Sequence, residues 1–348
     1  MLRGKELLRL VAGGLLAAAL LWLVLHDQDP RRLWQLVRRA SLTGLCVSAV
    51  VGQAQVIFRV ARWRALLVPV RKDVPLLPMA EAFFIGYMTT WILPGRIGEV
   101  VRPMILSGKT GIPMGACLGS AVADRLLDLW AIVLLFALGL WNVPFPADAA
   151  GLAKLRLLAL PLLAAAVLGL VAMAWVAAHR DRLVARLAPR RGPVAWAARA
   201  ALSLSQGADA MRRPALLARI VVHSLLVWLT IDLATWIGVR AAGADVTFGA
   251  ILVIMPALAF GIAIPTPGGV GGYHVAMRES LRWFSVPKDT AVGVGFLMHL
   301  AVVVPAIVLG LVALRTSGLR LAELKRAVSS ISRLGAADPA PTGLEATP

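Results

Sequence analysis

Long, uninterrupted apolar runs dominate this sequence and restrict what it can fold into. Residues 7–25 and 290–314 are almost entirely apolar. A helix of about 20 residues, rising about 1.5 Å per residue, crosses a hydrocarbon core about 30 Å thick. The chain is 59% hydrophobic and 16% charged, with a mean hydropathy of +0.80. We therefore expect an all-α polytopic membrane protein, and not a soluble enzyme, a secreted disulfide scaffold or a nucleic-acid-binding domain.

Six runs are long enough to span a membrane, because each is mostly Leu, Ala, Val, Ile and Trp over at least 19 positions. No small-residue cleavage site follows the first run, which predicts a retained helix. The predicted spans are 7–25, 42–60, 114–140, 157–178, 217–240 and 290–314.

Two further apolar runs, 76–93 and 248–264, are each followed by a Gly/Pro-rich break and a short amphipathic stretch. This pattern predicts two broken, re-entrant helical hairpins, around 76–107 and 248–284. In residues 30–40, arginines lie opposite apolar side chains at helical spacing, which predicts a helix along the membrane interface.

The net charge of +18 does not require nucleic acid as a partner, because membrane proteins concentrate Lys and Arg in their cytoplasmic loops. With both termini in the cytoplasm, the cytoplasmic segments hold 22 Lys and Arg and the outside loops hold seven. That count places Arg59, Arg62 and Arg64 in a cytoplasmic segment. It also makes 179–216 an intracellular connector and 315–348 a largely disordered cytoplasmic tail.

The two breaks share a PGxxG spelling, at 94–98 and 267–271. In the topology above they open to opposite sides of the membrane. The chain therefore divides into a first membrane half, 1–140, and a second, inverted half, 141–314, as in alternating-access transporters. The alternative is that the breaks are ordinary interfacial turns. The residues expected to form the breaks are Pro94, Gly95, Gly98, Pro267, Gly268, Gly269 and Gly271.

Charged residues at predicted membrane depth are costly, so they mark functional or paired sites. Arg96, Arg102 and Arg125 are candidates to bind a headgroup phosphate, and Glu99, Asp124 and Asp128 to orient them or to carry protons. The alternative is a buried ion network that only fixes helix packing. Secondary candidates are Asp232, His274, Arg278 and Glu279.

The sequence gives no sign of a metal, a cofactor or a catalytic motif. Cys46 and Cys117 are 71 positions apart, which excludes a CxxC pair. The five histidines lie in separate segments, and we expect His223 and His299 to pack as polar residues inside spans.

The ordered motifs LPGRIGEVVRPMIL (93–106), ADRLLDLW (123–130) and IPTPGGVGGYH (264–274) resemble the lysylphosphatidylglycerol synthase transmembrane-domain family, also described as flippase-like. The resemblance covers about 7–314. It implies a bacterial inner-membrane protein whose relatives join this domain to a cytosolic aminoacyl-lipid synthase and move the product across the bilayer. Because only about 34 residues follow the last predicted span, we expect no synthase domain here. Relatives often carry an acidic residue shortly after the third motif, whereas the first acidic residue after it here is Glu279.

Three functions remain open from the sequence. The first is a flippase that moves an anionic or phosphate-bearing membrane lipid by alternating access. The second is an integral-membrane transferase acting on a polyprenyl phosphate or lipid headgroup, with a carboxylate as general base. The third is a scaffold that assembles with a separate lipid-synthesis enzyme through the basic loop.

Overall fold

The computed structural model describes residues 4–93, 96–143, 154–187 and 210–319. These residues are 85% helical and contain no strand, which confirms the all-α prediction. Twelve α-helices lie in this described part: α1 (Gly4–Leu25), α2 (Pro30–Arg39), α3 (Leu42–Leu67), α4 (Leu76–Ile92), α5 (Gly98–Thr110), α6 (Met114–Asn142), α8 (Ala159–Ala178), α9 (Arg180–Leu187), α11 (Pro214–Ala241), α12 (Phe248–Ala263), α13 (Gly272–Arg282) and α14 (Lys288–Thr316).

All six predicted spans are helical, but the count of six is not confirmed. Four segments are long and apolar enough to cross a membrane alone: α3, α11, α14, and α8 with the short 3₁₀ helix before it (Lys154–Leu158). A fifth results if α1 and α2 count as one bent span. The remaining predicted span, 114–140, forms the 29-residue α6, which carries three charged residues in its middle. The chain is therefore a multi-pass membrane protein with four to five recognisable spans.

Helix α2 forms where the interfacial helix was predicted, and it lies at 87° to α1. Asp29 caps it by accepting a hydrogen bond from the Arg31 amide at 2.8 Å. Next to this cap, Lys288 at the start of α14 donates to Asp27, and this hydrogen bond lowers the pKa of the Asp27 carboxyl to about 2. The pair therefore stays charged at neutral pH and joins the end of α1 to α14.

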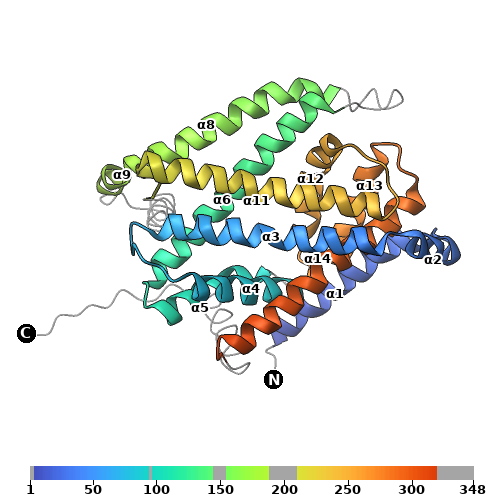
Figure 1. Cartoon of the computed structure of the whole chain (residues 1–348), viewed down its shortest axis with the longest axis horizontal. Coiled ribbons are helices and arrows are strands. Elements are labelled where there is room, and N and C mark those ends of the chain that lie inside the picture. The colour runs from blue at the N-terminus through green and yellow to red at the C-terminus, as the bar shows by residue number, and fades with distance from the viewer. Residues whose placement is uncertain (1–3, 94–95, 144–153, 188–209, 320–348) are drawn as a thin grey trace, which may run out of the picture.

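The predicted hairpins form two helix pairs, α4 with α5 and α12 with α13 (Figure 1). The long helices α3 and α11 pack along each other between these pairs, and Figure 1 shows the pairs toward opposite ends of α3. Helix α4 also packs on α14, and α12 on α6. Each hairpin therefore rests on the last long helix of the other half of the chain.

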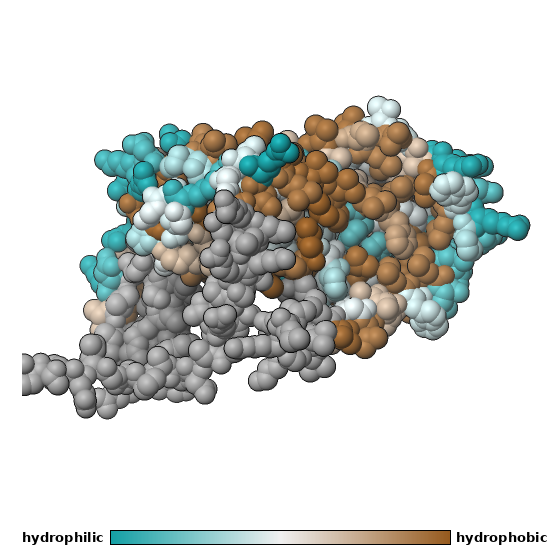
Figure 2. All heavy atoms as spheres, turned by 90° about the horizontal axis from the view of Figure 1, so that it is seen from below, coloured by the Kyte–Doolittle hydropathy of each residue, from teal (hydrophilic) through white to brown (hydrophobic). Residues whose placement is uncertain are grey.

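Buried apolar side chains form two main clusters, one around each hairpin. One joins α3, α4 and α5 with the start of α6 and the end of α14, and the other joins α6, α8, α11, α12, α13 and α14. On the surface shown in Figure 2, apolar side chains occupy the middle and polar ones the two ends. This is the pattern of a chain whose sides face lipid and whose ends face water.

Much of the predicted connector and tail lies outside the described residues. Helix α9 begins the connector, but 188–209 is not described. The tail predicted at 315–348 is described only through 319, after α14 ends at Thr316.

Candidate functional site

Eight charged side chains meet where α3, α5 and α6 come together. Five are arginines and three are carboxylates, which leaves a formal excess of two positive charges. They are Arg59, Arg62, Arg96, Arg102, Arg125, Glu99, Asp124 and Asp128.

Asp124 and Asp128, one turn apart on α6, hold this charged cluster together. Arg62 Nη2 lies 2.7 Å from Asp124 Oδ1 and 2.7 Å from Asp128 Oδ1. Asp124 Oδ2 lies 3.1 Å from Arg102 Nη2 and 2.9 Å from Arg125 Nη2. Both carboxylates are nearly or fully buried, and several guanidinium groups compensate each charge, as burial requires.

The sequence predicted a span that ends at residue 60, but α3 continues to Leu67 and carries both Arg59 and Arg62. Arg62 is fully buried, and Arg59 Nη1 lies 2.9 Å from Asp128 Oδ2. Arg59 Nε also donates to Gln55 Oε1 at 2.6 Å. The spacing of Gln55, Arg59 and Arg62 is a signal that could have revealed them, since it places three polar groups on one helix face.

Arg96, Glu99 and Arg125 form the accessible edge of the charged cluster. Their side chains are 41%, 29% and 36% exposed. Glu99 Oε1 lies 3.4 Å from Arg96 Nη2 and 3.3 Å from Arg125 Nη1. Arg96 precedes α5, and its φ of 54° is the left-handed conformation that few side chains adopt.

Arg102 lies deeper than Arg96, although both were predicted to bind a headgroup phosphate. Its side chain is 4% exposed. Its guanidinium stacks over the ring of Trp63 at 4.7 Å and that of Phe83 at 5.5 Å. Arg102 is therefore buried, while Arg96 lies at the accessible edge of the charged cluster.

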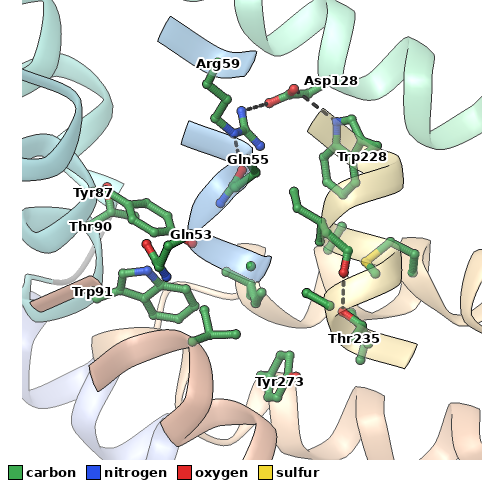
Figure 3. Close-up of a pocket in the computed structure, with 18 of the residues that line it drawn as sticks. Gln53, Gln55, Arg59, Tyr87, Thr90, Trp91, Asp128, Trp228, Thr235 and Tyr273 are labelled. Atoms are coloured by element: carbon green, nitrogen blue, oxygen red, sulfur yellow. Dashed lines mark hydrogen bonds and ion pairs between the residues drawn. The ribbon is translucent and has the colours of Figure 1, made fainter. Parts of the chain in front are cut away.

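A cavity of about 330 Å³ extends from the charged cluster between the two halves of the chain. Figure 3 shows Arg59 and Asp128 at one end and Tyr273 at the other. Its walls come from the helices of both halves, α3 to α6 and α11 to α14, and most of the wall away from the cluster is apolar or aromatic. The space is amphipathic, with charge at one end.

Glycines allow close helix packing in both hairpins. A Cβ on Gly98 would lie 1.8 Å from the Gly86 carbonyl oxygen, so α4 and α5 touch there. A Cβ on Gly272 would lie 2.3 Å from the Gly261 oxygen, which brings α12 and α13 equally close.

The second break contains three glycines with positive φ, namely Gly268, Gly269 and Gly271, at 62°, 66° and 87°. It begins with a 3₁₀ turn at Pro267–Gly269. Pro94 and Gly95 of the first break lie outside the described residues.

The secondary candidates do not join the charged cluster. Asp232 on α11 is 1% exposed, and neither carboxylate oxygen has a hydrogen-bond partner among the described residues. Arg278 pairs with Glu279 at 2.6 Å and donates to the Leu23 carbonyl of α1. His274 accepts from the Gly271 amide at 3.3 Å, which is a local structural bond.

No group of three or more metal-ligating side chains occurs in the described part of the chain. No curated protein matches the chain. Residues 10–310 match the family described as the lysylphosphatidylglycerol synthase TM region. This match covers most of the sequence, and the chain therefore belongs to the lysylphosphatidylglycerol synthase TM-region family.

Proposed function

We propose that this chain moves a phosphate-bearing lipid across the bacterial inner membrane by alternating access of its two halves. The family suggests a membrane protein involved in lipid handling. The observation that carries the proposal is the cavity between the halves, charged at one end and mainly apolar elsewhere. A phospholipid has the same division between an anionic headgroup and apolar chains.

The charge balance of the cluster supports an anionic ligand. Five arginines face three carboxylates, so one phosphate would bring the cluster closer to neutrality. Arg96 and Arg125 are the most accessible of the arginines, and both contact Glu99 Oε1 at more than 3.2 Å. In our proposal the phosphate displaces Glu99 from these two guanidinium groups, which offer the two-point geometry that phosphate favours.

The pairing of the carboxylates favours transport over the transferase alternative. Asp124 and Asp128 each contact at least two arginines. A carboxylate held in this way is a poor general base, because the guanidinium groups stabilise its ionised form.

The helix pairings support an inverted repeat. Helix α4 packs on α14 as α12 packs on α6, and each hairpin closes on a glycine contact, Gly86 with Gly98 and Gly261 with Gly272. We propose re-entrant hairpins opening to opposite sides, with both chain termini in the cytoplasm. A separate lipid-synthesis enzyme would supply the substrate.

The test is transport by the purified chain in liposomes without any added donor substrate. Acyl-labelled fluorescent phosphatidylglycerol is the probe, and dithionite destroys the label that reaches the outer leaflet. We expect the protected inner-leaflet fluorescence to fall with wild type and to persist when Arg96→Gln and Arg125→Gln are combined. Arg315→Gln, at the exposed end of α14, is the matched control and should transport normally. Wild-type liposomes that behave like protein-free ones would refute the proposal.

A further inference from the structure

Asp232 is a buried acidic residue in the middle of α11, outside the charged cluster. It is 1% exposed, and neither of its carboxylate oxygens has a hydrogen-bond partner among the residues that the structure describes. The three carboxylates of the charged cluster differ, since each lies within 3.4 Å of an arginine nitrogen. Acidic groups at membrane depth commonly mark ion or proton pathways, so Asp232 needs a functional explanation.

Two tryptophans place Asp232 where α11 meets α6 and the start of α12. Trp228 and Trp236 lie four residues before and after it, on the same helix face. Trp228 Nε1 donates to Asp128 Oδ1 of α6 at 3.1 Å, and Trp236 Nε1 donates to the Val246 carbonyl, just before α12, at 2.9 Å. Both indole N–H groups are therefore engaged elsewhere, and neither stabilises a charge on Asp232.

The helices around α11 offer Asp232 no compensating charge. Helix α11 packs against α3, α6, α12 and α14, and α12 has no titratable side chain. On α3, α6 and α14, the charged side chains belong to the charged cluster or lie near the helix ends. His299, in the middle of α14, is the other titratable group that lines the cavity outside the cluster. On α11 itself, His223 and Arg240 are at least eight positions away. Because burial without a partner disfavours a charge, Asp232 holds a proton in this arrangement.

The proposed movement of the two halves changes the surroundings of this carboxyl. Helix α6 belongs to the first half and α11 to the second, and the hydrogen bond from Trp228 to Asp128 joins them. The cavity is also close, because Trp228 and Thr235 of α11 line it (Figure 3). When the halves separate here, water from the cavity reaches Asp232 and stabilises the ionised carboxylate. The proton is therefore held when α6 and α11 are together and can leave when they are apart.

We propose that Asp232 is a proton-binding site and that the halves exchange sides only while it holds a proton. The carboxyl O–H bond is the only bond that forms or breaks, and the proton comes from water in the open cavity and returns to it. An ionised Asp232 cannot enter the closed arrangement without becoming a buried, unpaired charge. This inference rests on the proposed function for the two arrangements and adds a condition that controls movement between them.

The test is the pH dependence of lipid movement in the liposome assay with fluorescent phosphatidylglycerol, at equal pH on both sides. From neutral to alkaline pH, the lipid phosphate and the arginines keep their charge. We expect wild-type transport to fall by up to about tenfold per pH unit, because the protonated fraction of a hydrated carboxyl falls in that proportion. Asp232→Asn is permanently neutral, so its transport should stay constant and exceed that of wild type at alkaline pH.

Controls separate this inference from the proposed function. Asp232→Glu keeps a titratable carboxyl and should keep the pH dependence, as should His299→Gln and the exposed control Asp245→Asn. Loss of the pH dependence in His299→Gln would assign the proton to His299 instead. If wild-type transport does not change with pH, or if Asp232→Asn declines as steeply as wild type or is folded but inactive, the proton site is overturned while the proposed function stands. If wild type moves no lipid at any pH, the proposed function fails and this inference fails with it.

Infrared spectroscopy of wild type in an ester-free detergent gives a second test, which requires no folded variant. A protonated carboxyl has a C=O stretching band of its own, separate from the bands of a carboxylate. We expect this band at neutral pH, and its absence would overturn the proton site.

Discussion

At the scale of single residues, the excess of arginine in the charged cluster makes the loss of a carboxylate more destabilising than the loss of an arginine. Removing Asp124 raises the excess positive charge from two to three and leaves Arg62 and Arg102 with one carboxylate partner fewer. Removing Arg102 lowers that excess. We therefore expect Asp124→Asn to cost about 3–5 kcal/mol of stability, the usual cost of breaking a buried ion pair, and Arg102→Gln to cost less.

Thermal unfolding of the detergent-solubilised variants measures this order. The double variant of Asp124→Asn and Arg102→Gln should recover part of the loss. Asp245→Asn is the matched control, because the Asp245 side chain is 88% exposed, and it should be neutral. An equal or greater loss from Arg102→Gln would contradict the charge balance derived from the ion pairs.

Asp232 presents the opposite case, a buried carboxyl with no partner among the described residues. An ionised carboxylate there would cost several kcal/mol, so the group should be neutral. Asparagine has the same shape, so Asp232→Asn should change the free energy of unfolding by no more than about 0.5 kcal/mol. Its folded yield should therefore match that of wild type. Size-exclusion profiles of Asp232→Asn and Asp124→Asn made in parallel test this. A loss as large as that of Asp124→Asn would mean that Asp232 is charged and paired.

The sequence predicted all three helices that supply the charged cluster, but only part of the cluster's charge. Asp124, Arg125 and Asp128 stand out because they interrupt an apolar run. Arg59 and Arg62 do not, because they lie at the end of the apolar run of α3 and look like the basic residues that set topology. Only the tertiary structure shows that α3 extends beyond its apolar run and places both arginines against Asp128 of α6.

At the scale of helices, the first hairpin depends on contact between α4 and α5. A methyl group on Gly98 would overlap the Gly86 oxygen at 1.8 Å and the Thr90 hydroxyl at 2.2 Å. We expect Gly98→Ala to force the helices apart, to lower stability by about 1–3 kcal/mol, and to reduce transport. Thermal unfolding and the liposome assay measure both effects.

Gly108 on the same helix supplies the matched control. A Cβ there meets nothing within 4 Å. Gly108→Ala should therefore be neutral or stabilise α5 by about 0.5–1 kcal/mol, since alanine favours a helix interior. If Gly98→Ala is as mild as Gly108→Ala, the close approach of α4 and α5 is absent in the membrane.

The hairpins also show where sequence reasoning works at the scale of helices. Both were predicted from apolar runs interrupted by PGxxG, and both appear as paired helices close to the predicted bounds. The partner glycines Gly86 and Gly261 were not predicted, because they lie inside apolar runs where nothing in the local pattern marks a contact.

At the scale of the whole molecule, the proposed topology places the ends of α3 and α11 on opposite sides of the membrane. Lys72 follows α3, and Asp245 follows α11. In a background of Cys46→Ser and Cys117→Ala, we expect an impermeant maleimide to label Asp245→Cys in intact cells. Lys72→Cys should react only after the membrane is opened. Reversed labelling would overturn the orientation, and labelling of both in intact cells would contradict an odd number of crossings between them.

Alternating access requires the two halves to move against each other, and α3 and α11 form the long contact between them. A Cβ on Gly52 would lie 3.5 Å from the Ala234 Cβ, within the spacing of a disulfide. In the same cysteine-free background, Gly52→Cys with Ala234→Cys should therefore crosslink on oxidation. Transport should stop when the bond forms and return on reduction, while each single cysteine variant keeps transporting. Undiminished transport by a fully crosslinked protein would show that the halves do not rock about α3 and α11, and alternating access would have to be abandoned for this chain.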